Sequence, residues 1–159
     1  MDILDTTPKN GMTFNHSGTH IDPELRPLWR ISLIALTLMK LCSGNKANSK
    51  KIQTLYSLVA SEKKRRAYTE SVSESGTTDS INIRFDPLVD RAVDMGVGEK
   101  IFQIDDAKSI KLTEKGLAFA KRIDKDSETF TIEKEFISQF KKSYFSNNVI
   151  NNLITGDLS

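Results

Sequence analysis

The chain contains 159 residues, 38% of them hydrophobic and 28% charged, and its formal net charge is +2. This length predicts one domain with short appendages, and the nearly balanced charge does not favour a dedicated nucleic-acid-binding domain, which is usually strongly basic. The single Cys42 excludes a disulfide framework and a cysteine-based zinc site. Because no signal-peptide pattern follows Met1 and the apolar run 28–42 is too short to span a bilayer, we expect a cytoplasmic protein without membrane contact.

Residues 1–21 are predicted to form a mobile N-terminal arm, since they are polar and lack apolar periodicity. His16 and His20 have the i, i+4 spacing that two metal ligands need on a helix. Gly18 lies between them, however, and no third ligand is near in the sequence. We therefore expect neither a metal ion nor a cofactor.

A long helix is predicted to start at Asp22-Pro23 or at Arg26-Pro27 and to run through Cys42. Its residues are apolar nearly all round, so the helix has to be covered on several sides. We expect it at the centre of the core, with one face meeting a partner chain. The Ser-Gly-Asn stretch 43–45 is typical of a helix end.

A second, amphipathic helix is predicted to follow, capped by Asn48 or Ser49. Its apolar side chains recur at helical spacing at Ile52, Leu55, Tyr56 and Val59. The helix is expected to continue into a basic stretch, where cations at a helix C-terminus interact favourably with the helix dipole. This stretch is interpreted either as a solvated helix end or as a contact with nucleic-acid phosphates. The candidate nucleic-acid-binding residues are Lys63, Lys64, Arg65 and Arg66.

A Ser/Thr/Gly-rich loop is predicted over residues 71–80, before a strand in which Ile81, Ile83 and Phe85 alternate with polar residues. Asp86-Pro87 then opens another helix, because Asp caps free amides and Pro is tolerated at the first helical position. The apolar face of this helix comprises Leu88, Val89, Ala92 and Val93. Its end is expected at Gly96 and Gly98, with both glycines at positive φ.

A hairpin is predicted next, from two short β-prone runs, 101–104 and 109–112, joined by the polar link 105–108. Thr113 is expected to cap the following helix, with Leu112 and Leu117 forming a hydrophobic staple. The alternating strand before the hairpin is a candidate third member of its sheet. Helix, hairpin and capped helix in this order predict an α+β fold, a winged helix-turn-helix domain over residues 22–124.

A C-terminal helical extension is predicted over residues 125–159, since aromatic residues recur there at helical spacing. One or two helices are expected to bury this stripe, either against the first helix or against another protein, which includes a second copy of the chain. The candidate partner-binding residues of the extension are Phe136, Phe140 and Tyr144.

The helix after Pro87 is acidic, with Asp86, Asp90 and Asp94 spaced four residues apart on one face. Arg91 is the only cation between Asp86 and Gly98. A helix that enters the major groove has to approach phosphates, which such a stripe repels. The three carboxylates are therefore candidate partner-binding residues on a helix used for protein contacts, unless they simply solvate an outer face. No nucleophile, acid/base pair or phosphate-binding loop is evident, so we do not expect an enzyme.

Three stretches, 55–60, 83–92 and 112–116, resemble in order and sequence the small middle components of bacterial three-component ABC-ATPase defence systems, among them Lamassu-type antiphage systems. The resemblance covers about residues 25 to 123 and leaves the N-terminal arm and the 71–80 loop unplaced. It implies a non-catalytic winged-helix subunit that works beside an SMC-like ATPase and an effector, as kleisin-interacting subunits do in chromosome-organising complexes. DNA backbone contact within the complex is a further expectation. The alternative is a winged-helix transcription regulator that binds DNA.

Overall fold

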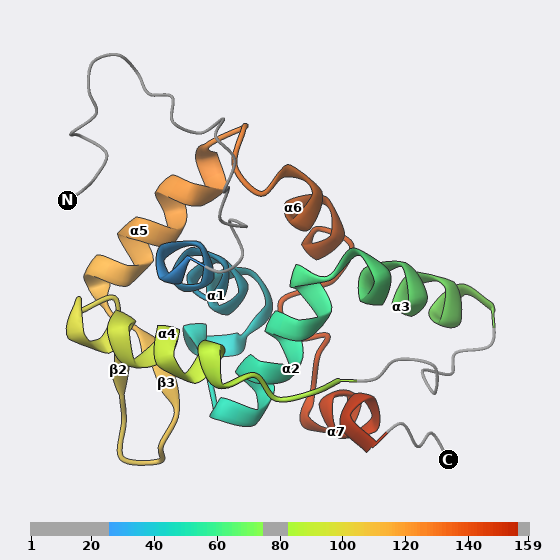
Figure 1. The fold of residues 1–159 in the computed structure, drawn as a ribbon, viewed down its shortest axis with the longest axis horizontal. Coiled ribbons are helices and arrows are strands. Elements are labelled where there is room, and N and C mark those ends of the chain that lie inside the picture. Colours follow the sequence, from blue (N-terminus) through green and yellow to red (C-terminus); the bar gives the residue numbers. More distant parts are fainter. Residues whose placement is uncertain (1–25, 75–82, 156–159) are drawn as a thin grey trace, which may run out of the picture.

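The protein has a mixed α+β fold in the computed structural model, which describes residues 26–74 and 83–155 (Figure 1). The predicted N-terminal arm, 1–21, lies outside the described residues. Within them the elements are, in order, α1 (Pro27–Leu41), the 3₁₀ turn η3 (Ser43–Asn45), β1 (Lys46–Ala47), α2 (Ser49–Ala60), α3 (Glu62–Glu74), α4 (Pro87–Gly98), β2 (Phe102–Ile104), β3 (Ile110–Leu112), α5 (Glu114–Lys125), α6 (Thr131–Ile137) and α7 (Asn147–Thr155).

Helix α1 is the centre of the core, as its apolar sequence predicts. It starts with Pro27 at the first helical position, after the N-cap Arg26. It contacts α2, α4, α5 and α6, and Figure 1 looks nearly along its axis. Leu33 and Leu38 are fully buried. The chain's own helices thus cover most of α1. We expected one face of this helix to meet a partner chain, and the exposed Leu28 in its first turn is what remains of such a face.

The three strands form one antiparallel sheet in the order β1-β3-β2. The prediction of a strand up to Phe85 is wrong over the described residues 83–85, which are irregular. Ile83 is buried and Phe85 is 57% exposed, so the alternation reflects packing without strand pairing. The third strand is instead β1, where Ala47 pairs with Ile110 of β3.

The predicted hairpin and the cap after it are confirmed. The Asp105 carboxylate accepts hydrogen bonds from the backbone N–H groups of Ala107 and Ser109 and thereby shapes the link between β2 and β3. Thr113 Oγ1 accepts a hydrogen bond from the backbone N–H of Gly116 at the start of α5. Both interactions join residues at most four positions apart, which is why local sequence predicts them.

Helix α4 ends at Gly98, as expected, but Gly96 lies within the helix and neither glycine has the predicted positive φ. The positive φ after the helix belongs to Lys100, at 67°. A Cβ built on Gly96 would overlap the ring of Phe102. Gly96 is therefore needed for the close approach of β2 to α4, and not for a turn.

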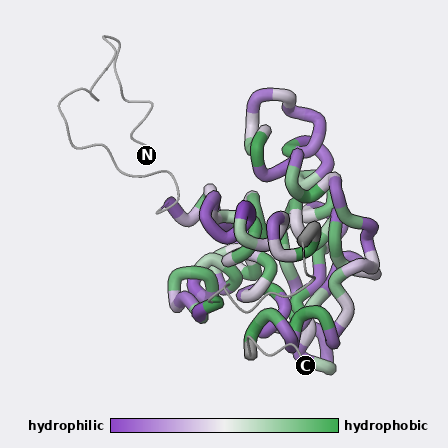
Figure 2. The backbone as a smooth tube through the Cα atoms, turned by 90° about the vertical axis from the view of Figure 1, so that its right-hand side faces the viewer, coloured by the Kyte–Doolittle hydropathy of each residue, from purple (hydrophilic) through white to green (hydrophobic). Residues whose placement is uncertain are grey.

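The helix is interrupted at Ser61, between α2 and α3, so the prediction of one continuous helix is wrong. Ser61 Oγ accepts a hydrogen bond from the backbone N–H of Lys64 and caps α3. Helix α3 extends to Glu74, so the loop expected from Ser71 is wrong up to that residue. The mainly charged sequence of α3 gives it the purple colour of hydrophilic segments in Figure 2.

The extension beyond residue 125 forms two helices that pack on the rest of the chain. Helix α6 contacts α1 and α2, and α7 contacts α2. Ile137, Phe145 and Leu153 join the same buried cluster as the side chains of α1. The apolar residues of this extension thus complete the core of the chain itself.

Candidate functional site

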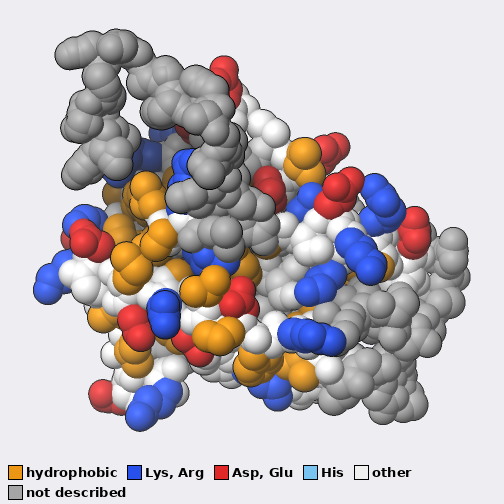
Figure 3. Space-filling view, in the orientation of Figure 1, with side chains coloured by type: hydrophobic (Ala, Val, Ile, Leu, Met, Phe, Trp, Pro, Cys, Tyr) orange, Lys and Arg blue, Asp and Glu red, His pale blue; other side chains and the backbone are white. Residues whose placement is uncertain are grey.

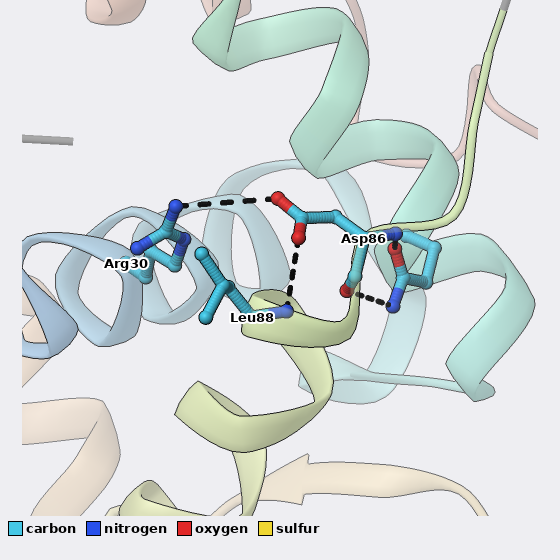
Figure 4. Close-up of polar contacts among 4 residues, drawn as sticks. Arg30, Asp86 and Leu88 are labelled. Carbon is cyan, nitrogen blue, oxygen red and sulfur yellow. Dashed lines mark hydrogen bonds and ion pairs between the residues drawn. The ribbon is translucent and has the colours of Figure 1, made fainter. Parts of the chain in front are cut away.

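Asp86 positions the start of helix α4, as predicted from the Asp-Pro pair. Its Oδ1 accepts a hydrogen bond from the backbone N–H of Leu88 at 2.9 Å, and its Oδ2 lies 4.0 Å from the guanidinium of Arg30 (Figure 4). Arg30 comes from α1 and is only 4% exposed. Its Nε finds no hydrogen-bond partner among the described residues. Asp86 is thus engaged within its own chain.

Gln53 of α2 also holds the N-terminus of α4 in place, through the backbone of Asp86 and the side chain of Asp90. Its Nε2 donates to the backbone O of Asp86 at 3.0 Å and to Oδ1 of Asp90 at 2.9 Å, and its Oε1 accepts from the backbone N–H of Asp86 at 2.9 Å. Sequence reasoning missed both Gln53 and Arg30. The available signal was a polar side chain at a position where the helix pattern demands an apolar one.

The predicted acidic stripe is therefore divided between two environments. Asp86 and Asp90 turn towards Arg30 and Gln53, so the first two carboxylates orient α4 on α1 and α2. Asp94 is exposed on the outward side of the helix. Of the three candidate carboxylates, Asp94 is the one that is exposed and does not help to fasten α4. It therefore remains available for contact with a partner protein.

The outward side of α4 carries apolar side chains beside charged ones. Leu88 and Met95 are 37% and 48% exposed, and Arg91 is exposed between them. Figure 3 shows hydrophobic, basic and acidic side chains side by side over this helix. We call Leu88, Arg91, Asp94 and Met95 the α4 surface. Phe85, just before the helix, is a further exposed apolar side chain.

The four cations of the basic stretch predicted to touch phosphates lie in different environments. Arg65 is 9% exposed and donates a hydrogen bond to the carbonyl of Val59, so it is wrong as a nucleic-acid contact. Lys64 Nζ donates to Ser57 Oγ at 2.8 Å, and Arg66 pairs with Glu62 at 2.9 Å. The break at Ser61 places these cations in the first turns of α3, and not at a helix C-terminus. Lys63 is exposed.

The C-terminal aromatic residues pack mainly against α3 and against each other. Phe136 is 4% exposed, so the prediction that it binds a partner is wrong. The ring centroid of Phe140 lies 5.1 Å from that of Phe136 and 5.9 Å from that of Tyr68 in α3. Tyr144 is 39% exposed, and its hydroxyl lies 3.2 Å from that of Tyr68. Burial and this hydrogen bond raise the pKa of Tyr68.

Two open cavities lie beside α3. One, of about 310 Å³, lies between α2 and residues 84–87 and is lined by Lys64, Arg84 and Phe85, among others. The other, of about 360 Å³, lies between α3 and α6. Within residues 26–74 and 83–155, no group of three or more His, Cys, Asp or Glu side chains is placed to hold a metal ion. None of the described helices has the length and apolarity to cross a membrane.

Comparison with protein-family models, with curated proteins and with solved structures finds no match to this chain. The geometry of α4 and its surroundings is therefore the feature of the molecule that bears on its function. That geometry comprises a helix fastened at its N-terminus by Arg30 and Gln53, with an exposed face that is apolar and weakly charged.

Proposed function

We propose that the chain is a non-catalytic winged-helix subunit that binds a partner protein through the α4 surface. The order α1, β1, α2, α4 and the β2–β3 hairpin supports this proposal, because it is compatible with a winged helix in which α3 is an insertion between the two helices of the helix-turn-helix. In this proposal α4 corresponds to the helix that DNA-reading winged helices insert into the major groove.

The observation that carries the proposal is the composition of the α4 surface. Leu88 and Met95 are exposed apolar side chains, and neither can make the hydrogen bonds that distinguish base edges. Asp94 would repel phosphates, and Arg91 is the one basic residue of α4. Exposed apolar side chains next to polar ones are typical of protein–protein interfaces, whose centres are depleted in charge.

For the partners we propose an SMC-like ATPase and an effector, in a Lamassu-type antiphage defence complex of the bacterial cytoplasm. The support is the resemblance of three stretches, which fall in α2, across the start of α4, and across the β3–α5 junction. The second of these stretches contains Asp86, which holds the start of α4 through Gln53, a residue just before the first stretch. In this proposal the chain assembles and positions other subunits.

Co-purification tests the proposal. The tagged full-length chain, purified from its native host under mild conditions, should bring down an ATPase of the SMC type, identified by mass spectrometry. The double variant Leu88→Asp/Met95→Asp should lose it, because two charges are placed in the apolar contact. The matched control is Val72→Asp/Ile132→Asp, which changes two exposed apolar residues of α3 and α6 and should retain the partner.

Recovery of the same partner with both double variants would exclude the α4 surface as the interface. Tight, sequence-selective binding of the purified chain to DNA at physiological salt would make it a transcription regulator instead. The neighbouring genes separate the two functions as well. An adjacent gene for an SMC-like ATPase supports the adaptor, whereas a divergent promoter with a palindromic operator supports the regulator.

A further inference from the structure

Two segments without acidic residues meet at one end of the core. Residues 41–61 and 136–156 contain no Asp or Glu. Lys142 Nζ donates a hydrogen bond to Asn45 Oδ1 at 2.7 Å, across 97 residues of sequence. The fold thus brings the lysine-bearing link between α6 and α7 onto the turn between α1 and α2, where the first segment carries its own lysines.

The sheet adds a further cation to the same place. Lys46 of β1 stands directly opposite Lys111 of β3, and both are exposed. Like charges directly opposite one another in a sheet are destabilising unless a counter-charge is near. Asp105 Oδ2 lies 3.8 Å from Lys46, while its Oδ1 accepts the two backbone hydrogen bonds of the hairpin link. A single carboxylate is thus set against the two paired lysines, which leaves an excess of positive charge at this point of the sheet.

Lys51 completes the group from the first turn of α2. It and Lys142 both lower the pKa of the buried thiol of Cys42, so both lysines lie near the end of α1. The N-terminus of α2, with its positive dipole end, lies there too. We call Lys46, Lys51, Lys111 and Lys142 the lysine surface. It includes none of the four residues of the α4 surface.

We propose that the lysine surface binds the phosphate backbone of nucleic acid without reading its sequence. Duplex DNA carries one negative charge per roughly 1.7 Å of axis, a dense counter-charge for neighbouring lysines that repel one another. Lysine is a flexible point charge, which suits phosphate contact but not the two-pronged recognition of a base edge. This inference goes beyond the proposed adaptor role and does not depend on it.

The test uses the purified full-length chain and a fluorescent 20-base-pair duplex of arbitrary sequence, because the phosphates are the proposed ligand. Binding is followed by anisotropy over a salt series that starts near 50 mM. The variant Lys46→Gln/Lys111→Gln/Lys142→Gln is compared with the control Lys115→Gln/Lys121→Gln/Lys125→Gln, whose three exposed lysines lie on α5. Both variants change the net charge from +2 to −1, that is 2 − 3.

The lysine-surface variant should bind at least tenfold more weakly, and its salt slope should fall by roughly 0.9 for each phosphate that the protein no longer neutralises. The control should keep the wild-type slope. Equally weakened binding by both variants would show attraction by net charge alone and overturn the proposal. Binding that depends on duplex sequence, or binding to phosphatidylserine vesicles without binding to DNA, would also overturn it. If the triple variant does not melt cooperatively, Lys111→Gln alone should lower the slope by about 0.9, and an unchanged slope would contradict the proposal.

Discussion

Gln53 in α2 clasps the backbone of Asp86, the N-cap of α4, through two hydrogen bonds of 3.0 and 2.9 Å. The side chain is 2% exposed, and its amide has a third partner in Asp90. Three helices are thereby fixed at one point, since Asp86 also faces Arg30 of α1. These contacts at the start of α4 therefore set how the helix, and with it the α4 surface, is oriented.

Replacing Gln53 should therefore destabilise the fold and loosen α4. We expect Gln53→Leu to lower the free energy of unfolding by about 2–4 kcal/mol, because it removes three hydrogen bonds and leaves the part-buried backbone N–H of Asp86 without its partner. Urea denaturation followed by circular dichroism measures this change. The control Gln139→Leu changes an exposed glutamine beyond α6 and should stay within about 0.5 kcal/mol of wild type. Equal stability of the two variants would contradict the anchoring role.

Gly96 and Gly98 provide a matched pair within one helix. A Cβ on Gly96 would overlap the ring of Phe102, whereas a Cβ on Gly98 meets nothing within 4 Å. Gly96→Ala should cost about 1–3 kcal/mol by overpacking, and Gly98→Ala should be neutral or stabilise by up to about 1 kcal/mol through helix propensity. Thermal melts of the two variants measure the difference. Stabilisation by both substitutions would mean that β2 does not approach α4 this closely.

Local chemistry made part of the fold predictable from sequence. The caps at Asn48, Asp86 and Thr113 each join a side chain to an amide two or three residues away, so short motifs reveal them. The pairing of Ala47 with Ile110 has no such signal in the sequence. A strand of two residues is too short to show an alternating pattern, and it is defined only by its pairing with another strand. The candidate site follows the same division. Helical spacing correctly places Val89, Ala92 and Val93 on the buried face of α4, but it places Leu88 there too, and Leu88 is 37% exposed. The anchoring of α4 by Gln53 arises from packing between distant helices.

Two cations of the basic stretch should differ in their contribution to stability, because one is buried and the other is exposed. Arg65→Ala should lower the free energy of unfolding by about 1.5–3 kcal/mol, because it removes a buried, charge-assisted hydrogen bond to the carbonyl of Val59. Lys63→Ala removes the same charge from an exposed site and should change stability by less than about 0.5 kcal/mol. Chemical denaturation of both variants decides the matter. A neutral Arg65→Ala would return this side chain to the set of available phosphate contacts.

Cys42 makes the stability of the fold sensitive to alkaline pH. Burial raises the pKa of its thiol from 9.0 to about 11, an effect that the nearby Lys51 and Lys142 only partly oppose. Below about pH 9 the thiol is neutral in both the folded and the unfolded chain, so its stabilising contribution is complete. As the pH rises from about 9 to about 11, the unfolded chain gains a thiolate that the folded chain disfavours, and up to about 2–3 kcal/mol is lost.

The corresponding experiment compares wild type with Cys42→Ala in urea denaturation at several pH values between about 8 and 11. Lysine and tyrosine side chains titrate in the same range in both proteins, so the difference between their stabilities isolates the thiol. Wild type should lose its advantage over the variant as the pH rises. In the folded protein near pH 8 the thiol should also react slowly with an alkylating reagent, because the thiolate is the nucleophile and the side chain is buried. A stability difference that stays constant across this range, with fast alkylation, would place Cys42 at an accessible site.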